Sequence, residues 1–291
     1  MVSSSSELLP PSPLAYENPD FLNGADARGV RILSEYLEPL SRFRQQRIQD
    51  TVVFFGSART PSPEQVSGAP LAGLDIHPHQ GHLDPATEQE MVRYYEDARR
   101  LAYLLTEWSL GLQSNRHRFV VTSGGGPGIM EAANRGAAEA GGKTIGLNIR
   151  LPFEQHPNPY ITPELSFEFH YFFMRKYWFA YLAKGLVVFP GGFGTLDETF
   201  EILTLSQTHK LAKKTGIILY GSEYWKKAIN LDFFVEKGTI SPEDRDLFQF
   251  ADTPEEAFTL LRDGLTHNHL EKERHKPEAE IEVPEITRTT R

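Results

Sequence analysis

The chain has 291 residues, of which 40% are hydrophobic and 24% charged, a composition typical of a soluble globular protein. Thirty Lys and Arg against thirty-nine Asp and Glu give a net charge of -9, which argues against binding nucleic acid or an anionic membrane. The chain has no cysteine, so disulfides and Cys-ligated metals are excluded, and a reducing cytoplasm fits. No segment approaches the ~18 consecutive apolar residues of a membrane span, and the start does not resemble a signal peptide. We therefore expect a cytoplasmic protein with no membrane or nucleic-acid partner.

The first part of the chain predicts a tail, a helix, a strand and a long insert. Residues 1–24 have few apolar residues and no periodicity, so we expect a flexible or loosely docked N-terminal tail. Residues 25–50 predict an amphipathic helix that Pro39 should kink or interrupt. The run TVVFF at residues 51–55 predicts a buried strand. Residues 60–86 carry five prolines, three glycines and three histidines, which predicts an inserted loop.

From residue 87 onward, predicted helices and strands alternate along the chain. Helices are expected at residues 87–105, 128–140, 174–184, 195–208, 223–236 and 254–268. Strands are expected at residues 118–122, 144–148, 164–169, 185–189, 216–220 and 247–250. Near-continuous apolar strands between helices indicate a mainly parallel sheet with helices on both faces. We therefore predict a Rossmann-like α/β fold in a single domain over residues 25–268, followed by a charged C-terminal tail at 269–291.

Two glycine-rich segments each follow a predicted strand and precede a predicted helix: residues 122–128 (TSGGGPG) and residues 190–195 (PGGFGT). Glycine lets the backbone turn sharply and lets a ligand approach, and the following helix offers free N–H groups to a phosphate. Each segment alone could equally be a tight turn, but two in one α/β chain favour a nucleotide site at the carboxyl edge of the sheet. With the shorter strand exit at residues 56–57, the candidates are Gly56, Ser57, Gly124, Gly125, Gly126, Gly191, Gly192 and Gly194.

Neither glycine-rich segment has the spacing of a dinucleotide-binding or triphosphate-binding loop. A dinucleotide fingerprint would need a third glycine at position 131, where the chain has Glu131, and no Gly-Lys-Ser/Thr follows either segment. We therefore expect a mononucleotide with a single phosphate as the ligand, and no NAD or other cofactor.

Four charged residues are candidates for catalysis or binding. Asp197 and Glu198 fall in the first turn of the helix after the second glycine segment, where acids also occur simply because they complement the helix dipole. A carboxylate there could instead face the sugar of a bound nucleotide and stabilise a cationic transition state. Arg175 and Lys176 lie in an aromatic stretch, and a buried guanidinium needs a partner. That partner could equally be an internal carboxylate or a ligand phosphate.

The histidines predict no metal site. His77, His79 and His82 have a His-x-His-x-x-His spacing, but they lie in the predicted insert with no helix to fix their geometry, so we expect an exposed loop. His170, in the aromatic stretch, is expected to be a core residue rather than an acid or base.

The run Pro190-Gly-Gly-Phe-Gly-Thr-Leu-Asp-Glu198, with Arg175-Lys176 upstream, resembles the LONELY GUY (LOG) family of cytokinin-activating phosphoribohydrolases, long misannotated as lysine decarboxylases. The run Gly124-Gly-Gly-Pro-Gly-Ile-Met130 is similar to a second motif of that family, one residue shorter, and the Phe-Gly-Ser after the first predicted strand matches too. The resemblance covers roughly residues 50–265 outside the insert. The insert, the N-terminal helix and the charged tail depart from the short plant-type members and suggest a longer bacterial subgroup.

The resemblance implies a Rossmann-like domain that forms a homodimer or an assembly of dimers. It implies hydrolysis of the N-glycosidic bond of a nucleoside 5′-monophosphate, giving the free base and ribose 5-phosphate without a metal or cofactor. Arg175 and Glu198 match the catalytic pair of the family. Substrate contacts are expected at the glycines named above and at Glu154, Lys176, Phe193, Thr195 and Asp197. Two alternatives remain: a non-catalytic nucleotide sensor or cofactor carrier on the same fold, and a partner-binding module using the insert and the tails.

Overall fold

The computed structural model describes residues 12–68, 84–151, 156–211 and 214–271. Its centre is a sheet of seven strands in the order β4-β3-β2-β1-β5-β6-β7, and every neighbouring pair is parallel. The predicted Rossmann-like α/β fold is therefore confirmed. The strands are β1 (Thr51–Phe55), β2 (Val120–Ser123), β3 (Thr144–Ile149), β4 (Ser166–Phe169), β5 (Ala183–Val188), β6 (Gly216–Tyr220) and β7 (Gln249–Ala251).

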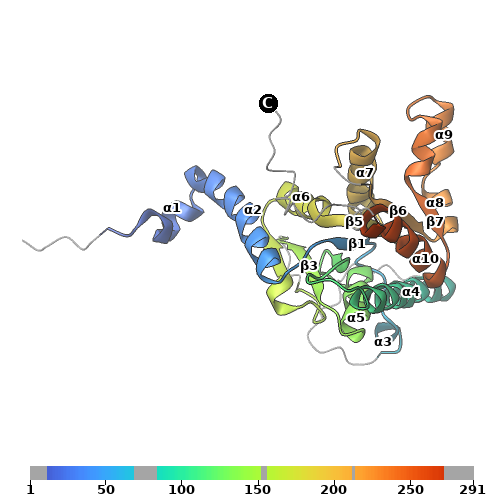
Figure 1. Ribbon diagram of the computed structural model, residues 1–291, viewed down its shortest axis with the longest axis horizontal. Helices are drawn as coiled ribbons and strands as arrows, with labels where there is room; N and C mark the ends of the chain where they lie inside the picture. The colour runs from blue at the N-terminus through green and yellow to red at the C-terminus, as the bar shows by residue number, and fades with distance from the viewer. Residues whose placement is uncertain (1–11, 69–83, 152–155, 212–213, 272–291) are drawn as a thin grey trace, which may run out of the picture.

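Helices cover both faces of this sheet (Figure 1). One face packs against α4 (Pro85–Leu110), α5 (Ile129–Glu139) and α10 (Pro254–Leu265). The other packs against α2 (Arg28–Gln45), α6 (Phe172–Leu182) and α7 (Phe193–Gln207). Alternate residues of β1 serve the two cores, with Val52 and Phe54 in the first and Val53 and Phe55 in the second. Within the described ranges, no helix is both long and apolar enough to cross a membrane.

The strand order reverses between β1 and β5, which are direct neighbours in the sheet. The chain builds outward from β1 to β4 in one direction, then crosses back through α6 to β5 and continues to β7. Ligands of open parallel sheets bind outside the carboxyl ends of the strands at such a switch point. The fold therefore places the segments after β1 and β5 at the position where a ligand is expected.

The structure differs from the predicted local structure in three places. Helix α2 continues through Pro39 without interruption, because the carbonyl group that loses its partner there finds another donor, as described below. The predicted helix 223–236 is two helices, α8 (Ser222–Ala228) and α9 (Leu231–Glu236), because the Asn230 side chain accepts the N–H of Phe233 and starts a new helix. The short helices α1 (Pro19–Asn23) and α3 (Pro63–Val66) were also not predicted.

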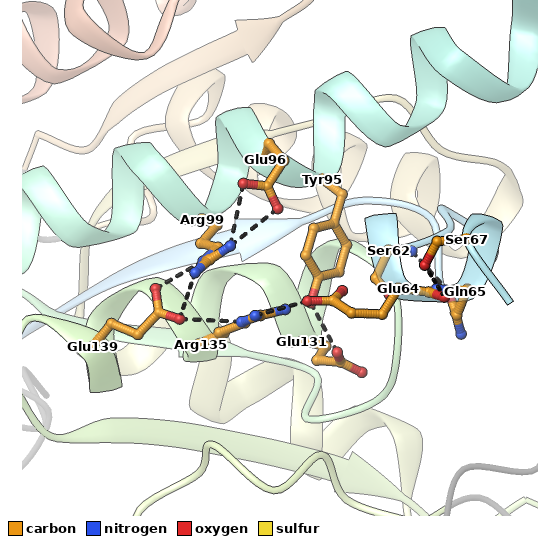
Figure 2. Close-up of polar contacts among 10 residues, drawn as sticks. All are labelled: Ser62, Glu64, Gln65, Ser67, Tyr95, Glu96, Arg99, Glu131, Arg135 and Glu139. Atoms are coloured by element: carbon orange, nitrogen blue, oxygen red, sulfur yellow. Dashed lines mark hydrogen bonds and ion pairs between the residues drawn. The ribbon is translucent and has the colours of Figure 1, made fainter. Parts of the chain in front are cut away.

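The start of the predicted insert is folded onto the domain rather than being a loop. Ser62 caps α3 in a capping box with Gln65, and Glu64 Oε1 lies 2.9 Å from Arg135 Nη2 on α5. Figure 2 shows Arg135 between Glu64 and Glu139, with Arg99 of α4 also bound to the Glu139 carboxylate. This network joins α3, α4 and α5 into one unit.

Candidate nucleotide site

The segments after β1, β2 and β5 meet at the carboxyl edge of the sheet. The N–H of Ser57 donates to the carbonyl oxygen of Pro190 at 3.0 Å, which joins the exits of β1 and β5. The N–H of Ile129, the first residue of α5, donates to the carbonyl oxygen of Ser57 at 3.1 Å. The structure therefore brings together the three glycine-containing segments that the sequence singled out.

The first glycine segment is held in a conformation that other residues would strain. Gly125 and Gly128 have φ angles of +75° and +68°, and a Cβ on Gly128 would lie 2.3 Å from the carbonyl oxygen of Ser57. The carbonyl oxygens of Gly125 and Gly126 accept from Asn158 Nδ2 at 3.1 and 3.0 Å. Asn158 was not predicted, because it belongs to an irregular segment 33 residues away from Gly125 with no motif of its own.

The second glycine segment leads directly into α7 and leaves its N-terminus uncapped. Gly192 is the N-cap residue and supplies no side-chain cap, so among the described residues the first-turn N–H groups lack the usual acceptor. A Cβ on Gly192 or Gly194 would meet no atom within 4 Å, and the ring of Phe193 is 93% exposed. This open helix end, with its positive dipole, is suited to an anion.

Gly191 packs closely on the first turn of α7. A Cβ on this residue would lie 2.2 Å from Thr195 Oγ1, so only glycine fits beside the buried Thr195. The Tyr224 hydroxyl donates to the carbonyl oxygen of Gly191 at 3.1 Å and holds the segment from α8. Tyr224 was also missed from the sequence, because α8 follows the next strand and its side-chain direction has no local signal.

Arg175 and Glu198 form a buried ion pair across α6 and α7. Arg175 Nη2 lies 3.3 Å from Glu198 Oε1, and the two side chains are only 15% and 7% exposed. The guanidinium also lies over the rings of Phe172 and Phe179, at 5.1 and 5.6 Å from their centroids. Among the described residues, the buried Arg175 Nε has no hydrogen-bond partner. The guanidinium thus pairs with an internal carboxylate, one of the two partners expected from the sequence.

Burial sets the proton affinity of both groups. It raises the pKa of Glu198 from 4.5 to about 7, although Arg175 and Lys176 oppose the rise by favouring the carboxylate. Burial also lowers the pKa of Arg175 from its ordinary value, with Glu198 acting in the opposite direction. A carboxyl group with a pKa near neutrality can exchange a proton during catalysis, which a surface glutamate at pH 7 does poorly.

Lys176 binds two carboxylates of α7 beside this pair. Its Nζ lies 2.8 Å from Asp197 Oδ2 and 2.9 Å from Glu201 Oε2. Glu201 was not predicted, although its spacing of four residues from Asp197 puts both on one side of a helix. Lys176 and Asp197 therefore form an ion pair of their own, and each is the sequence neighbour of one member of the Arg175–Glu198 pair.

Some candidates lie elsewhere. Glu154 and the histidines at 77, 79 and 82 lie outside the described residues. The expectation for His170 was wrong: its side chain is exposed, because the residue falls in the turn between β4 and α6. Within the described ranges, no three His, Asp or Glu side chains are grouped so as to hold a metal ion.

The chain is similar to a family of known proteins. Residues 130–261 match the family model described as "Possible lysine decarboxylase". A probable cytokinin riboside 5′-monophosphate phosphoribohydrolase of Arabidopsis thaliana is 28% identical over 144 residues, covering 50% of this chain and 71% of that protein. A probable enzyme of the same name from Oryza sativa subsp. japonica is 27% identical over 159 residues, covering 51% and 70%.

Among solved structures, the molybdenum cofactor binding protein of Rippkaea orientalis is 16% identical with a TM-score of 0.44, covering 74% of this chain and 96% of that one. The matched residues 130–261 include α6, α7 and the glycine segment at residues 190–195. The resemblance predicted from that motif is confirmed: the chain is similar to curated members of the LOG family.

Proposed function

We propose that this protein hydrolyses the N-glycosidic bond of a nucleoside 5′-monophosphate, releasing the free base and ribose 5-phosphate. The observation that carries the proposal is the buried Arg175–Glu198 pair, one turn beyond the uncapped N-terminus of α7. The names of the curated relatives, cytokinin riboside 5′-monophosphate phosphoribohydrolases, support the same reaction. The preferred base is left open.

The phosphate would bind at the start of α7. The free N–H groups of its first turn and the hydroxyl of Thr195 supply donors for the phosphate oxygens, and the glycines leave space for them. Contacts to the phosphate lie away from the bond that breaks, so their binding energy can hold the sugar in position for the reaction.

Glu198 would act at the anomeric carbon of the ribose. As a carboxylate it stabilises positive charge at C1′ and accepts a proton from the attacking water, whose oxygen forms the new bond to C1′. The C1′–N bond breaks with its electron pair passing to the base, which then takes up a proton. Arg175 orients the carboxylate through their ion pair.

The reaction is tested by incubating the protein with AMP or isopentenyladenosine monophosphate and measuring free base by chromatography. We expect base release by the wild-type protein and none by Glu198→Gln, which keeps the size of the side chain but cannot become a carboxylate. Glu223→Gln is the matched control, because Glu223 is an exposed glutamate on α8 paired only with Lys227 in the described contacts. Undiminished turnover by Glu198→Gln would refute the role of this residue. Tight AMP binding with no base released over hours would instead favour a nucleotide sensor or carrier.

We further propose that the chain forms a homodimer, as expected from the family resemblance. Support comes from an exposed apolar stripe on α2, formed by Val30, Leu33 and Leu37, which faces away from the core. The test is the molar mass by light scattering during gel filtration, compared between the wild type and Leu33→Asp. A monomeric wild type would refute this proposal.

A further inference from the structure

The N-terminal helix α2, which departs from the short plant-type members, makes specific polar contacts with the helix that carries Arg175. Glu35 Oε1 accepts the backbone N–H of His170 at 2.7 Å, and Glu35 Oε2 accepts that of Tyr171 at 3.2 Å. Tyr171 is the N-cap residue of α6 and provides no side-chain cap itself. The carboxylate from α2 therefore caps the start of α6, where a negative charge also complements the helix dipole.

Pro39 makes a second contact with α6 possible. Proline has no N–H, so the carbonyl oxygen of Glu35, four residues earlier, loses its partner within the helix. The indole Nε1 of Trp178 on α6 donates to this oxygen at 2.8 Å. The buried proline thus leaves an acceptor at the place where α6 offers a donor, which also explains why α2 tolerates it.

The side chain and the backbone carbonyl of Glu35 bind residues on either side of Arg175 in the sequence. Its carboxylate holds residues 170 and 171, its carbonyl oxygen holds Trp178, and the N–H of Arg175 itself donates to the carbonyl oxygen of Tyr171. The rings over which the guanidinium lies, Phe172 and Phe179, also belong to α6. The position of Arg175 relative to Glu198 on α7 therefore depends on where α6 is held.

We infer that Glu35 is a positioning residue, which holds α6 from α2 so that Arg175 meets Glu198. The inference rests on the proposed function and assigns to the N-terminal helix a part in the active site of the same chain. Misplacing a catalytic group by about 1 Å can cost as much as a hundredfold in rate, so a cap far from the substrate can act on turnover.

The test compares Glu35→Ala, Glu35→Gln and the control Glu38→Ala, whose glutamate lies on the same helix but pairs with Arg42 on the surface. We expect Glu35→Ala to lower kcat for AMP hydrolysis by roughly ten- to a hundredfold. Its dissociation constant for ribose 5-phosphate should stay within about twofold, because α2 has no described contact with residues 190–195. Glu35→Gln keeps one acceptor oxygen and should restore most of kcat, whereas Glu38→Ala should match the wild type.

A pH readout separates positioning from loss of folding. The charges acting on Glu198 are Arg175 and Lys176 from α6, which lower its pKa, and Asp197 and Glu201 from α7, which raise it. Burial against α6 raises the pKa of Glu198 and the two cations of α6 lower it, so loosening that helix should shift this pKa in Glu35→Ala, as followed by NMR of the carboxyl carbon.

Two results would overturn the inference. One is a wild-type kcat and an unchanged Glu198 pKa in a folded Glu35→Ala protein, or in Glu35→Leu, which also lacks both acceptor oxygens, if the alanine variant does not fold. The other is an equal loss in Glu38→Ala. The NMR titration and hydrogen exchange of residues 170–178 need no substrate, so they test the docking of α6 even if the wild type releases no base. If the wild type releases no base, the proposed function fails, and these two measurements still show whether Glu35 holds α6 in place.

Discussion

The ion pair between Glu64 and Arg135 gives a prediction whose size can be worked out from the structure. The hydrogen bond from Arg135 is the largest cause that lowers the pKa of Glu64, from 4.5 to about 2. At ~1.4 kcal/mol per pKa unit, lowering the pKa from 4.5 to about 2 would correspond to at most ~3.5 kcal/mol. The Glu64 side chain is 36% exposed and Arg135 15%, so solvent screening reduces the expected value to about 1–2 kcal/mol. We therefore expect Glu64→Gln to lower the free energy of unfolding by that amount at pH 7.

The same pair predicts how the effect changes with pH. The pKa of Glu64 is lower in the folded state than its ordinary value of 4.5 in the unfolded chain. Its contribution is therefore fully present above pH 4.5 and is lost as the pH falls toward 2. Urea unfolding followed by tryptophan fluorescence should show the stability difference between wild type and Glu64→Gln narrowing from pH 5 to pH 3.

The control for this measurement is Glu223→Gln, which removes an exposed pair with Lys227 on the surface of α8. We expect no measurable change in the free energy of unfolding for this variant. If Glu64→Gln also leaves stability unchanged at pH 7, or if its deficit is the same at pH 3 as at pH 7, the assigned ion-pair energy is wrong. The start of the insert would then be held on α5 by packing rather than by charge.

Three other predictions concern the site and the core. The carboxyl carbon of Glu198 should titrate near pH 7 by NMR, and a midpoint near 4.5 would contradict the effect of burial. Gly191→Ala should weaken ribose 5-phosphate binding at least about tenfold by calorimetry, because its Cβ would strike Thr195, whereas Gly216→Ala, with open space around its Cβ position, should not. Asp50→Ala should cost about 3–5 kcal/mol in urea unfolding, because the buried Arg118 loses its carboxylate; a cost below about 1 kcal/mol would show that the remaining contacts suffice.

The elements of the sheet could be predicted because their signals are local. Residues 51–55 and 216–220 are short apolar runs ended by glycine or by a turn, and both are strands with the predicted bounds. The strand order could not be predicted, because periodicity identifies a strand but not its neighbours. The break between α8 and α9 had a local signal that was overlooked, namely an asparagine placed to cap a second helix.

The same distinction between local signals and distant contacts applies to the residues of the candidate site. Arg175, Glu198 and the glycines belong to short motifs, so they could be named from the sequence, and the structure brings them to one edge of the sheet. Asn158 and Tyr224 act on glycine segments more than thirty residues away in the chain, and only the fold makes them neighbours. Pro39 was expected to kink or interrupt its helix. The group that donates to the freed carbonyl oxygen of Glu35 is the indole of Trp178, which is likewise distant in the chain.

Burial and the two neighbouring cations act in opposite directions on the pKa of Glu198, and this balance connects the docking of the helices with the proposed chemistry. Burial between α6 and α7 alone would keep the carboxyl group protonated at neutral pH, and a protonated acid could neither accept a proton from water nor stabilise a cationic sugar. Arg175 and Lys176 pull the pKa back to about 7, so that both protonation states are populated near neutrality. Because both cations are carried by α6, the proton affinity of Glu198 depends on the docking of a helix that α2 holds through Glu35. The N-terminal helix is thus coupled to the charge of a carboxylate that it does not touch.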